Sequence, residues 1–143
     1  MKLYSTLDIA RPADDVFAVI SDFSRNPEWQ GGMRSAEWTS EPPVAVGSTY
    51  DQVARFLGRD VITSFEVVAH EPGRSITIES RQSSFPITVT RSVEPIDETH
   101  TRVVADFDGR PGRFFGLLGP LLQRLAERSV REDYARLKEL LER

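Results

Sequence analysis

The chain has 143 residues, of which 39% are hydrophobic and 28% charged, and it contains no cysteine. This length is sufficient for one domain with a buried core, and the lack of cysteine excludes a disulfide framework, a thiolate metal site and a cysteine nucleophile. The formal net charge of -4 argues against nucleic acid as the main partner, because binding to phosphates needs a basic surface. No segment has the roughly 20 apolar residues that cross a bilayer, and the N-terminus lacks the apolar run of a signal peptide. We therefore expect a single cytoplasmic domain over residues 1–143, without integral membrane association.

The first part of the chain predicts a strand and two short helices. Alternation over residues 3–9 favours the strand, which Pro12 ends. This proline suits a first helical turn, and two aspartates follow it where carboxylates stabilise a helix N-terminus, so residues 12–22 predict a short amphipathic helix. Residues 24–29 have the turn chemistry that starts a second short helix, and the glycines at 31–32 end it.

Beyond residue 32, the pattern changes to short segments separated by turn residues. The predicted strands are Met33–Thr39, Ser48–Leu57, Asp60–His70, Ser75–Arg81, Phe85–Glu94 and Thr101–Asp108. Short connectors of this kind join antiparallel neighbours, so we expect a meander. With the first strand the count is seven, and strands grouped together with helices at the ends predict an α+β fold.

Alternation within the strands predicts which side chains point inward. The expected inward set is Tyr50, Gln52, Ala54, Phe56, Val61, Thr63, Phe65, Val67, Ile76, Ile78, Ser80, Ile87, Val89, Arg91, Val93, Val103, Ala105 and Phe107. Arg91 interrupts an otherwise apolar row. The carboxylates of Asp51, Glu66 and Glu79 fall on the opposite faces and are expected at the surface.

A long helix is predicted from Gly112 to Arg143. Its apolar stripe comprises Phe114, Leu118, Leu121, Leu122 and Leu125, and then Ala126, Val130, Tyr134, Leu137 and Leu141. We expect this stripe to cross a curved sheet. The glycines at 112, 116 and 119 and Pro120 predict a kinked entry into the helix, or alternatively a gate that lets Phe114 and Phe115 swing away for ligand entry.

Several segments together resemble the START-like (SRPBCC) helix-grip superfamily, which includes polyketide cyclases/dehydrases and lipid-transfer domains. The segments that carry the resemblance are residues 10–17, 22–29, 46–50, 56–59, 67–72 and 101–103. The resemblance implies a curved seven-stranded antiparallel sheet gripping the C-terminal helix, with two small helices closing one end. It also implies an apolar cavity between the sheet and that helix.

Polar residues on the inward face are the candidate ligand anchors. Arg91 is suited to a carboxylate, enolate or phosphate of a ligand; otherwise its head lies in water at a cavity mouth, or it pairs with an internal Asp or Glu. Tyr50 and Gln52 would orient a ligand, or else reach solvent. The full candidate lining is Tyr50, Gln52, Phe65, Ile78, Val89, Arg91, Phe107, Phe114, Leu118 and Leu121.

Neither a metal nor a cofactor is predicted. His70 and His100 lack metal-ligand spacing and are expected to be solvated turn residues. The sequence has no G-x-S-x-G elbow, phosphate-binding glycine loop or dinucleotide fingerprint. Trp29 and Trp38 are expected to pack in the core, or alternatively to cap the sheet or line an entrance.

The leading functional hypothesis is a binding module, monomeric or homodimeric, that holds a small hydrophobic or amphipathic ligand for carriage, sensing or sequestration. The resemblance also implies a polyketide cyclase/dehydrase-like lyase, in which Arg91 would stabilise enolate charge and Tyr50 or a bound water would move protons. A third hypothesis is a protein-interaction or co-chaperone-like module that uses the outer sheet or the terminal helix. An exposed apolar strip on the outer sheet would favour the interaction module. A closed cavity lined by polar groups would favour the enzyme, and a dry apolar cavity would favour the ligand carrier.

Overall fold

The computed structural model describes residues 2–56, 58–81, 86–109 and 119–143. Its elements in chain order are β1 (Lys2–Ile9), α1 (Ala13–Ile20), the 3-10 helix η1 (Phe23–Glu28), β2 (Met33–Trp38), β3 (Thr49–Phe56), β4 (Arg59–Glu71), β5 (Ser75–Arg81), β6 (Ile87–Pro95), β7 (Thr101–Gly109) and α2 (Gly119–Glu142). The predicted strands and helices are confirmed, with shifts of a few residues at their ends. Leu57, Phe85 and the predicted helix start at residues 112–118 lie outside the described residues.

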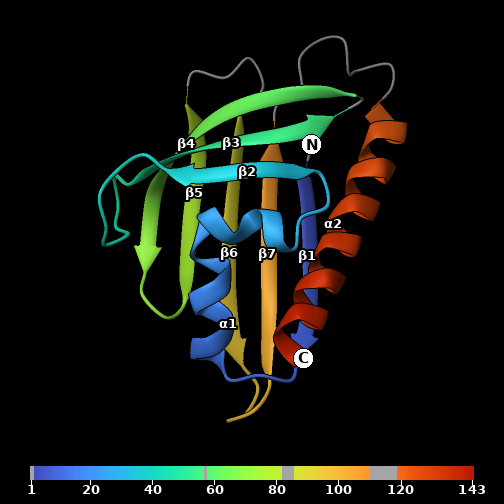
Figure 1. Ribbon diagram of the computed structural model, residues 1–143. Helices are drawn as coiled ribbons and strands as arrows, with labels where there is room; N and C mark the ends of the chain where they lie inside the picture. Colours follow the sequence, from blue (N-terminus) through green and yellow to red (C-terminus); the bar gives the residue numbers. More distant parts are fainter. Residues whose placement is uncertain (1, 57, 82–85, 110–118) are drawn as a thin grey trace.

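The strands form one antiparallel seven-stranded sheet in the order β1-β7-β6-β5-β4-β3-β2. From β2 to β7 the strands follow one another as a meander, and β1 pairs with β7 instead of beginning the meander beside β2. Figure 1 shows how the sheet curves, so that β2, β3 and β4 cross in front of the other strands. Register shifts near Ser35 and Ala69 mark irregularities of the kind that bend strands. The predicted α+β architecture is therefore confirmed.

The concave face of the sheet carries the described side chains that alternation predicted, whereas the predicted side chain of Phe56 lies outside what the structure describes. Those that are buried are Tyr50, Phe65, Val67, Ile76, Ile78, Val89, Arg91, Val93, Val103 and Ala105. Val61 differs, because it lies near the start of β4 and is 45% exposed. The carboxylates of Asp51, Glu66 and Glu79 are exposed or half-buried on the opposite face, as expected.

The two short helices cover one end of this concave face. α1 buries Val16, Phe17, Val19 and Ile20. Pro12 occupies its N-cap position, just before the first helical residue, where a missing N–H costs no helical hydrogen bond. η1 begins after Asp22, whose side chain accepts from the backbone N–H of Ser24 and so caps the helix.

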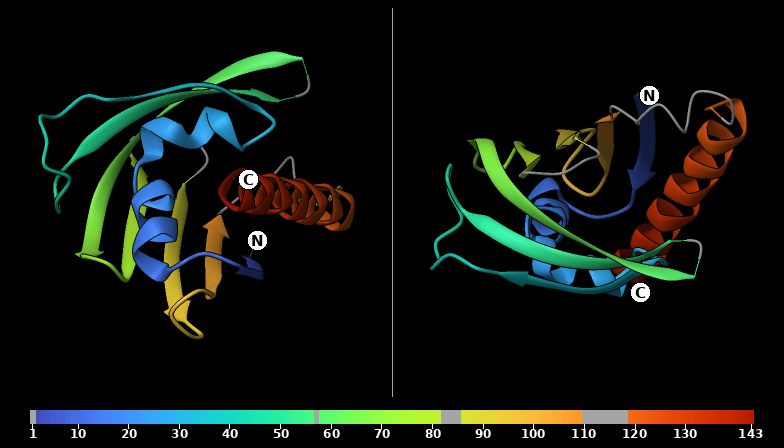
Figure 2. Two further views of the ribbon diagram at one scale, coloured as in Figure 1. Left: turned by 60° about the horizontal axis from the view of Figure 1, so that its bottom comes forward. Right: turned by 90° about the horizontal axis from the view of Figure 1, so that it is seen from above.

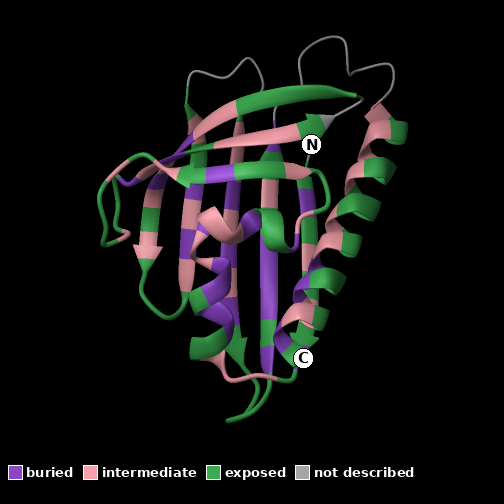
Figure 3. Cartoon of the chain, in the orientation of Figure 1, coloured by how far each residue is buried: buried purple, intermediate pink, exposed green. Residues whose placement is uncertain are grey.

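Only the C-terminal part of α2 is packed tightly, because its buried residues are Tyr134, Leu137 and Leu141. Leu121 is 57% exposed and Leu125 is 50% exposed, so the prediction that both lie on the packed stripe is wrong. Figure 3 shows exposed and intermediate residues along the first part of α2 and buried ones near its end. In Figure 2 the start of α2 points away from β3 and β4.

Helical geometry explains the position of these two leucines. The side of α2 that faces the protein runs in steps of four residues through Leu122, Ala126 and Val130, which are half-buried, to the buried Tyr134. Leu121 precedes this row by one residue, which rotates it by about 100° to the flank. Pro120 is the second residue of the helix. The glycines and phenylalanines of the predicted kink or gate at residues 112–116 lie outside the described residues.

Candidate functional site

The candidate lining residues form rows across the concave face. Phe107 lies opposite Val89, and Val89 lies opposite Ile78 on the next strand. Tyr50 lies opposite Phe65, with 5.2 Å between the ring centroids. These five residues belong to the main apolar core or pack against it. The structure therefore brings together residues that the sequence places on separate strands.

Tyr50 lies inside the core and does not reach solvent. It is 1% exposed, and its ring also stacks on Phe23 at 5.1 Å. Its hydroxyl donates a long hydrogen bond of 3.4 Å to Oε1 of Gln52, whose side chain is half-buried. Burial raises the pKa of the Tyr50 phenol far above its usual value, although the positive charge of Arg91 opposes this. The phenol therefore stays protonated near neutral pH and is unsuited to act as a base.

Arg91 points inward, as predicted, and is only 2% exposed. Its Nη1 donates to the carbonyl oxygen of Ile20 at 3.0 Å and to Oδ1 of Asn26 at 2.9 Å. Its guanidinium carbon lies 4.2 Å from the ring centroid of Phe23 and 4.7 Å from that of Trp29. Cation–π contacts of this kind partly replace the lost hydration of a buried cation.

Two of the sequence-based alternatives for Arg91 are wrong. A head group in water at a cavity mouth is contradicted by the 2% exposure of the residue. Pairing with an internal carboxylate is contradicted because no ion pair within the described part of the chain involves Arg91. The partners that sequence reasoning missed, Ile20 and Asn26, offer neutral acceptors from α1 and η1.

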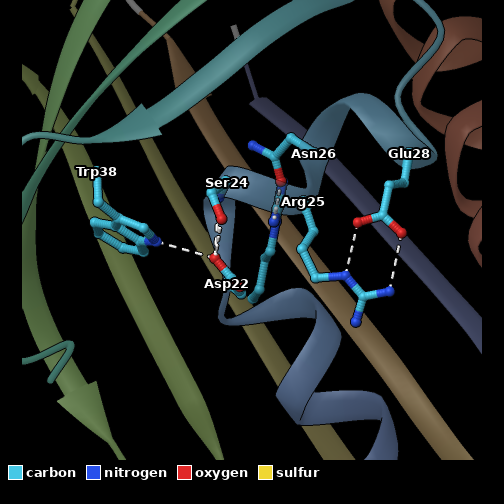
Figure 4. A network of polar contacts seen from close by, with 7 residues as sticks. Asp22, Ser24, Arg25, Asn26, Glu28 and Trp38 are labelled. Atoms are coloured by element: carbon cyan, nitrogen blue, oxygen red, sulfur yellow. Dashed lines mark hydrogen bonds and ion pairs between the residues drawn. The ribbon is translucent and has the colours of Figure 1, made fainter. Parts of the chain in front are cut away.

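Polar contacts hold η1 in place over the concave face, as Figure 4 shows. Oδ1 of Asp22 accepts from the hydroxyl of Ser24 at 2.5 Å and from Nε1 of Trp38 at 2.9 Å. Within η1, Arg25 and Glu28 form an ion pair of 2.7 Å. Trp38 is half-buried against the core, so the expectation that it packs there is confirmed. The network fixes the turn of η1 that presents Asn26 to Arg91.

A second set of contacts joins the end of η1 to α2. The rings of Trp29 and Tyr134 meet edge to face at 5.0 Å, and Trp29 is 1% exposed. Nε of Arg136 donates to the carbonyl oxygen of Trp29 at 3.0 Å, and Oδ1 of Asp133 accepts from the N–H of Gly31 at 2.9 Å. Arg136 and Asp133 also form an ion pair. Burial raises the pKa of the Asp133 carboxyl, which these hydrogen bonds oppose.

Of the remaining predicted site residues on the long helix, only Leu121 is described, and it lies apart from this cluster. Leu121 is 57% exposed on the flank of α2, and Phe114 and Leu118 lie outside the described residues.

His100 is an exposed turn residue, as predicted. His70, however, lies within β4 and is half-buried, with its ring stacked on Phe17 at a centroid distance of 6.3 Å, so the prediction of a solvated turn is wrong for it.

A separate pocket of about 330 Å³ lies near the start of η1 and the β2–β3 connection. It is lined by Ser21, Asp22, Trp38, Ser40, Glu41, Pro42, Val44 and Ser48. None of the predicted ligand-binding residues lines it. Within the described ranges, no group of His, Asp and Glu side chains is placed to hold a metal ion. None of the described helices is long and apolar enough to cross a membrane.

The model of the polyketide cyclase/dehydrase and lipid transport family matches residues 1–142. The chain belongs to this family. The match spans every described element from β1 to α2. The START-like resemblance that the sequence motifs suggested is therefore confirmed. A search of curated proteins finds no match.

Solved structures of other proteins share the fold of this chain. A protein of Thermus thermophilus, TTHA0849, is 21% identical with a TM-score of 0.82, over 99% of this chain and 97% of that one. A START superfamily protein of Mycobacterium smegmatis is 18% identical with a TM-score of 0.80, over 99% and 97% of the two chains. The Zhui aromatase/cyclase of a Streptomyces species is 18% identical with a TM-score of 0.80, over 100% and 94%. At these identities the likeness shows the fold alone.

Proposed function

We propose that this family member binds a small hydrophobic or amphipathic ligand, such as a lipid, between the sheet and α2, for carriage, sensing or sequestration. The observation that carries the proposal is the incomplete cover of the concave face. Ile87 and Phe107 point inward yet are only half-buried, and the row Leu122, Ala126 and Val130 on α2 is half-buried too. A guest that covered this surface would gain about 25 cal/mol per Å² of apolar area. The family fold is consistent with ligand binding in a hydrophobic cavity.

The proposed lining is the set predicted from the sequence without the exposed Leu121, and its described members lie at different depths. Gln52 and Phe107 are half-buried and so are accessible to a guest. Tyr50 and Arg91 lie deeper, at 1% and 2% exposure. Polar groups at the bottom of an apolar site orient a ligand, whereas the apolar wall supplies most of the affinity. We also propose that the protein acts in the cytoplasm as a monomer or homodimer, without a nucleic acid partner.

The first test is native mass spectrometry of freshly purified protein, which should reveal a co-purifying small molecule. The second test is a fluorescence titration with the uncharged apolar dye N-phenyl-1-naphthylamine. Replacing Ile87 with Trp fills the half-buried surface and should weaken dye binding about tenfold, since a ligand loses its contact area there. The matched control is Ile62→Trp, at a position that is 73% exposed on the outer face, and it should bind dye normally. Dye binding that neither substitution alters would contradict this location.

The second candidate function is a polyketide cyclase/dehydrase-like reaction, which the family description favours. Here Arg91 would stabilise enolate charge. The raised pKa of Tyr50 and its hydrogen bond to Gln52 weaken its proposed role in proton transfer. Incubation with a linear poly-β-ketone, followed by mass spectrometry for loss of water, tests this candidate, and an unchanged substrate mass would count against it.

A protein-interaction role has less support from the outer surface. Among the described residues, the most exposed large apolar side chains of the outer face are Tyr4 on β1 and Ile62 on β4, at 67% and 73%. The strands β7, β6 and β5 separate them in the sheet order. They therefore do not form the continuous apolar strip that a docking surface would need.

A further inference from the structure

Buried donors without partners gather where β6, η1 and α2 meet. Within the described part of the chain, the buried side-chain atoms without a hydrogen bond of good geometry are Nε1 of Trp29, Oε1 of Gln30, Nε of Arg91 and the hydroxyl of Tyr134. The glutamine oxygen is an acceptor, the tryptophan and arginine nitrogens are donors, and the tyrosine hydroxyl can both donate and accept. Trp29 contacts Arg91 at 4.7 Å and Tyr134 at 5.0 Å, so the donor residues form one cluster.

Arg91 and Tyr134 also interact electrostatically. Burial raises the pKa of the Tyr134 phenol, whereas the nearby charge of Arg91 and a side-chain hydrogen bond with Arg91 oppose that rise. The Tyr134 hydroxyl is therefore protonated near neutral pH and is available as a donor. Trp29, Arg91 and Tyr134 are 1%, 2% and 2% exposed, so bulk water does not satisfy them.

The cluster has an excess of positive charge as well as of donors. A buried donor without an acceptor costs about 1–3 kcal/mol, and an unpaired buried charge costs more. Arg91 has neutral acceptors in Ile20 and Asn26 and aromatic faces in Phe23 and Trp29, yet no carboxylate among the described residues pairs with it. The chemical complement of one cation and several donors is a monoanion with more than one acceptor oxygen.

We propose that Arg91, Trp29 and Tyr134 receive the carboxylate head group of an amphipathic monoanionic ligand. The inference rests on the proposed function and names the ligand class that this site would select. A carboxylate matches the single charge of Arg91 and accepts hydrogen bonds at both of its oxygens, whereas a phosphate dianion would exceed that charge.

The sheet provides a path for the tail of such a ligand. Val89 and Ile87 precede Arg91 on the same face of β6, and each step of two residues along a strand spans about 6.6 Å. Phe107 pairs with Val89, so an extended alkyl chain that starts at Arg91 would run along apolar side chains toward the half-buried Ile87.

Access to the cluster requires movement of α2. The three donor atoms are closed to solvent, and Tyr134, which lies on α2, packs its ring against Trp29. The residues of α2 before Tyr134 are half-buried or exposed, so less packing opposes movement there than at Leu137 and Leu141. The head group would therefore enter as this part of α2 moves outward.

The test is a competition against bound N-phenyl-1-naphthylamine with ligands of equal chain length. Dodecanoate should displace the dye at concentrations about tenfold lower than dodecanol, and dodecyltrimethylammonium should be the weakest competitor. Tyr134→Phe keeps the ring and removes the hydroxyl. It should therefore weaken the binding of dodecanoate about fivefold and leave the binding of dodecanol unchanged. Tyr4→Phe, at an exposed position on β1, is the matched control and should change neither.

The outcomes separate this inference from the proposed function. If the dye binds the protein and dodecanoate and dodecanol displace it equally well, the carboxylate site is overturned and only a general apolar cavity remains. Failure of the dye to bind folded protein would overturn both. A crystal structure of the dodecanoate complex should place the carboxylate within hydrogen-bond distance of Nε of Arg91. An ordered water at these donors, with the carboxylate elsewhere, would also overturn the inference.

Discussion

Replacing Leu137 with Ala should strongly destabilise the protein, because this residue anchors α2 to the sheet. Leu137 is 0% exposed and belongs to the main apolar core. Truncating a fully buried leucine to alanine costs about 2–5 kcal/mol, since it loses transfer free energy and leaves a cavity. Leu121 lies on the same helix but is 57% exposed. Truncation there should cost less than about 0.5 kcal/mol, because more than half of the side chain is already in water and alanine favours helix.

Urea unfolding followed by circular dichroism measures both variants. With a slope of about 1–3 kcal/mol per M for a small protein, Leu137→Ala should lower the midpoint by about 1–2 M, whereas Leu121→Ala should leave it nearly unchanged. Leu125→Ala, at 50% exposure, provides a second control on the same helix. Equal losses for Leu137→Ala and Leu121→Ala would show that the first half of α2 packs as tightly as the second. The incompletely covered concave face, and with it the ligand-binding proposal, would then lose its basis.

Other predictions concern the buried tyrosines and the start of η1. Because burial raises the pKa of Tyr50 and Tyr134, the folded state keeps their protons when the unfolded chain ionises above a pH of about 10. The free energy of unfolding should therefore fall by up to about 1.4 kcal/mol per pH unit for each tyrosine, and urea titrations of Tyr→Phe variants should show a shallower decline. Replacing Asp22 with Ala removes the cap and the acceptor of Trp38, and should cost about 1–3 kcal/mol in the same assay. An unchanged midpoint would show that this network does not hold η1.

The strands and their inward faces could be predicted from the sequence because both depend on local patterns. Turn residues bound each strand, and alternation with a period of two residues assigns each side chain to a face. This logic placed Arg91 and Tyr50 inside the fold, where the structure has them at 2% and 1% exposure. It failed for His70, because the half-burial of that residue depends on Phe17, from a helix distant in the sequence.

The sequence by itself therefore determined the order of elements, the antiparallel sheet, the family and the inward direction of Arg91. Only the tertiary structure decided what Arg91 meets, because Ile20 and Asn26 precede it by 71 and 65 residues. It also decided which part of α2 packs. A helical repeat defines an apolar side but not how much of the sheet lies beneath it, so Leu121 and Leu137 look alike in the sequence and differ in exposure. Contacts between distant segments depend on how the sheet curves, and local periodicity carries no information about that.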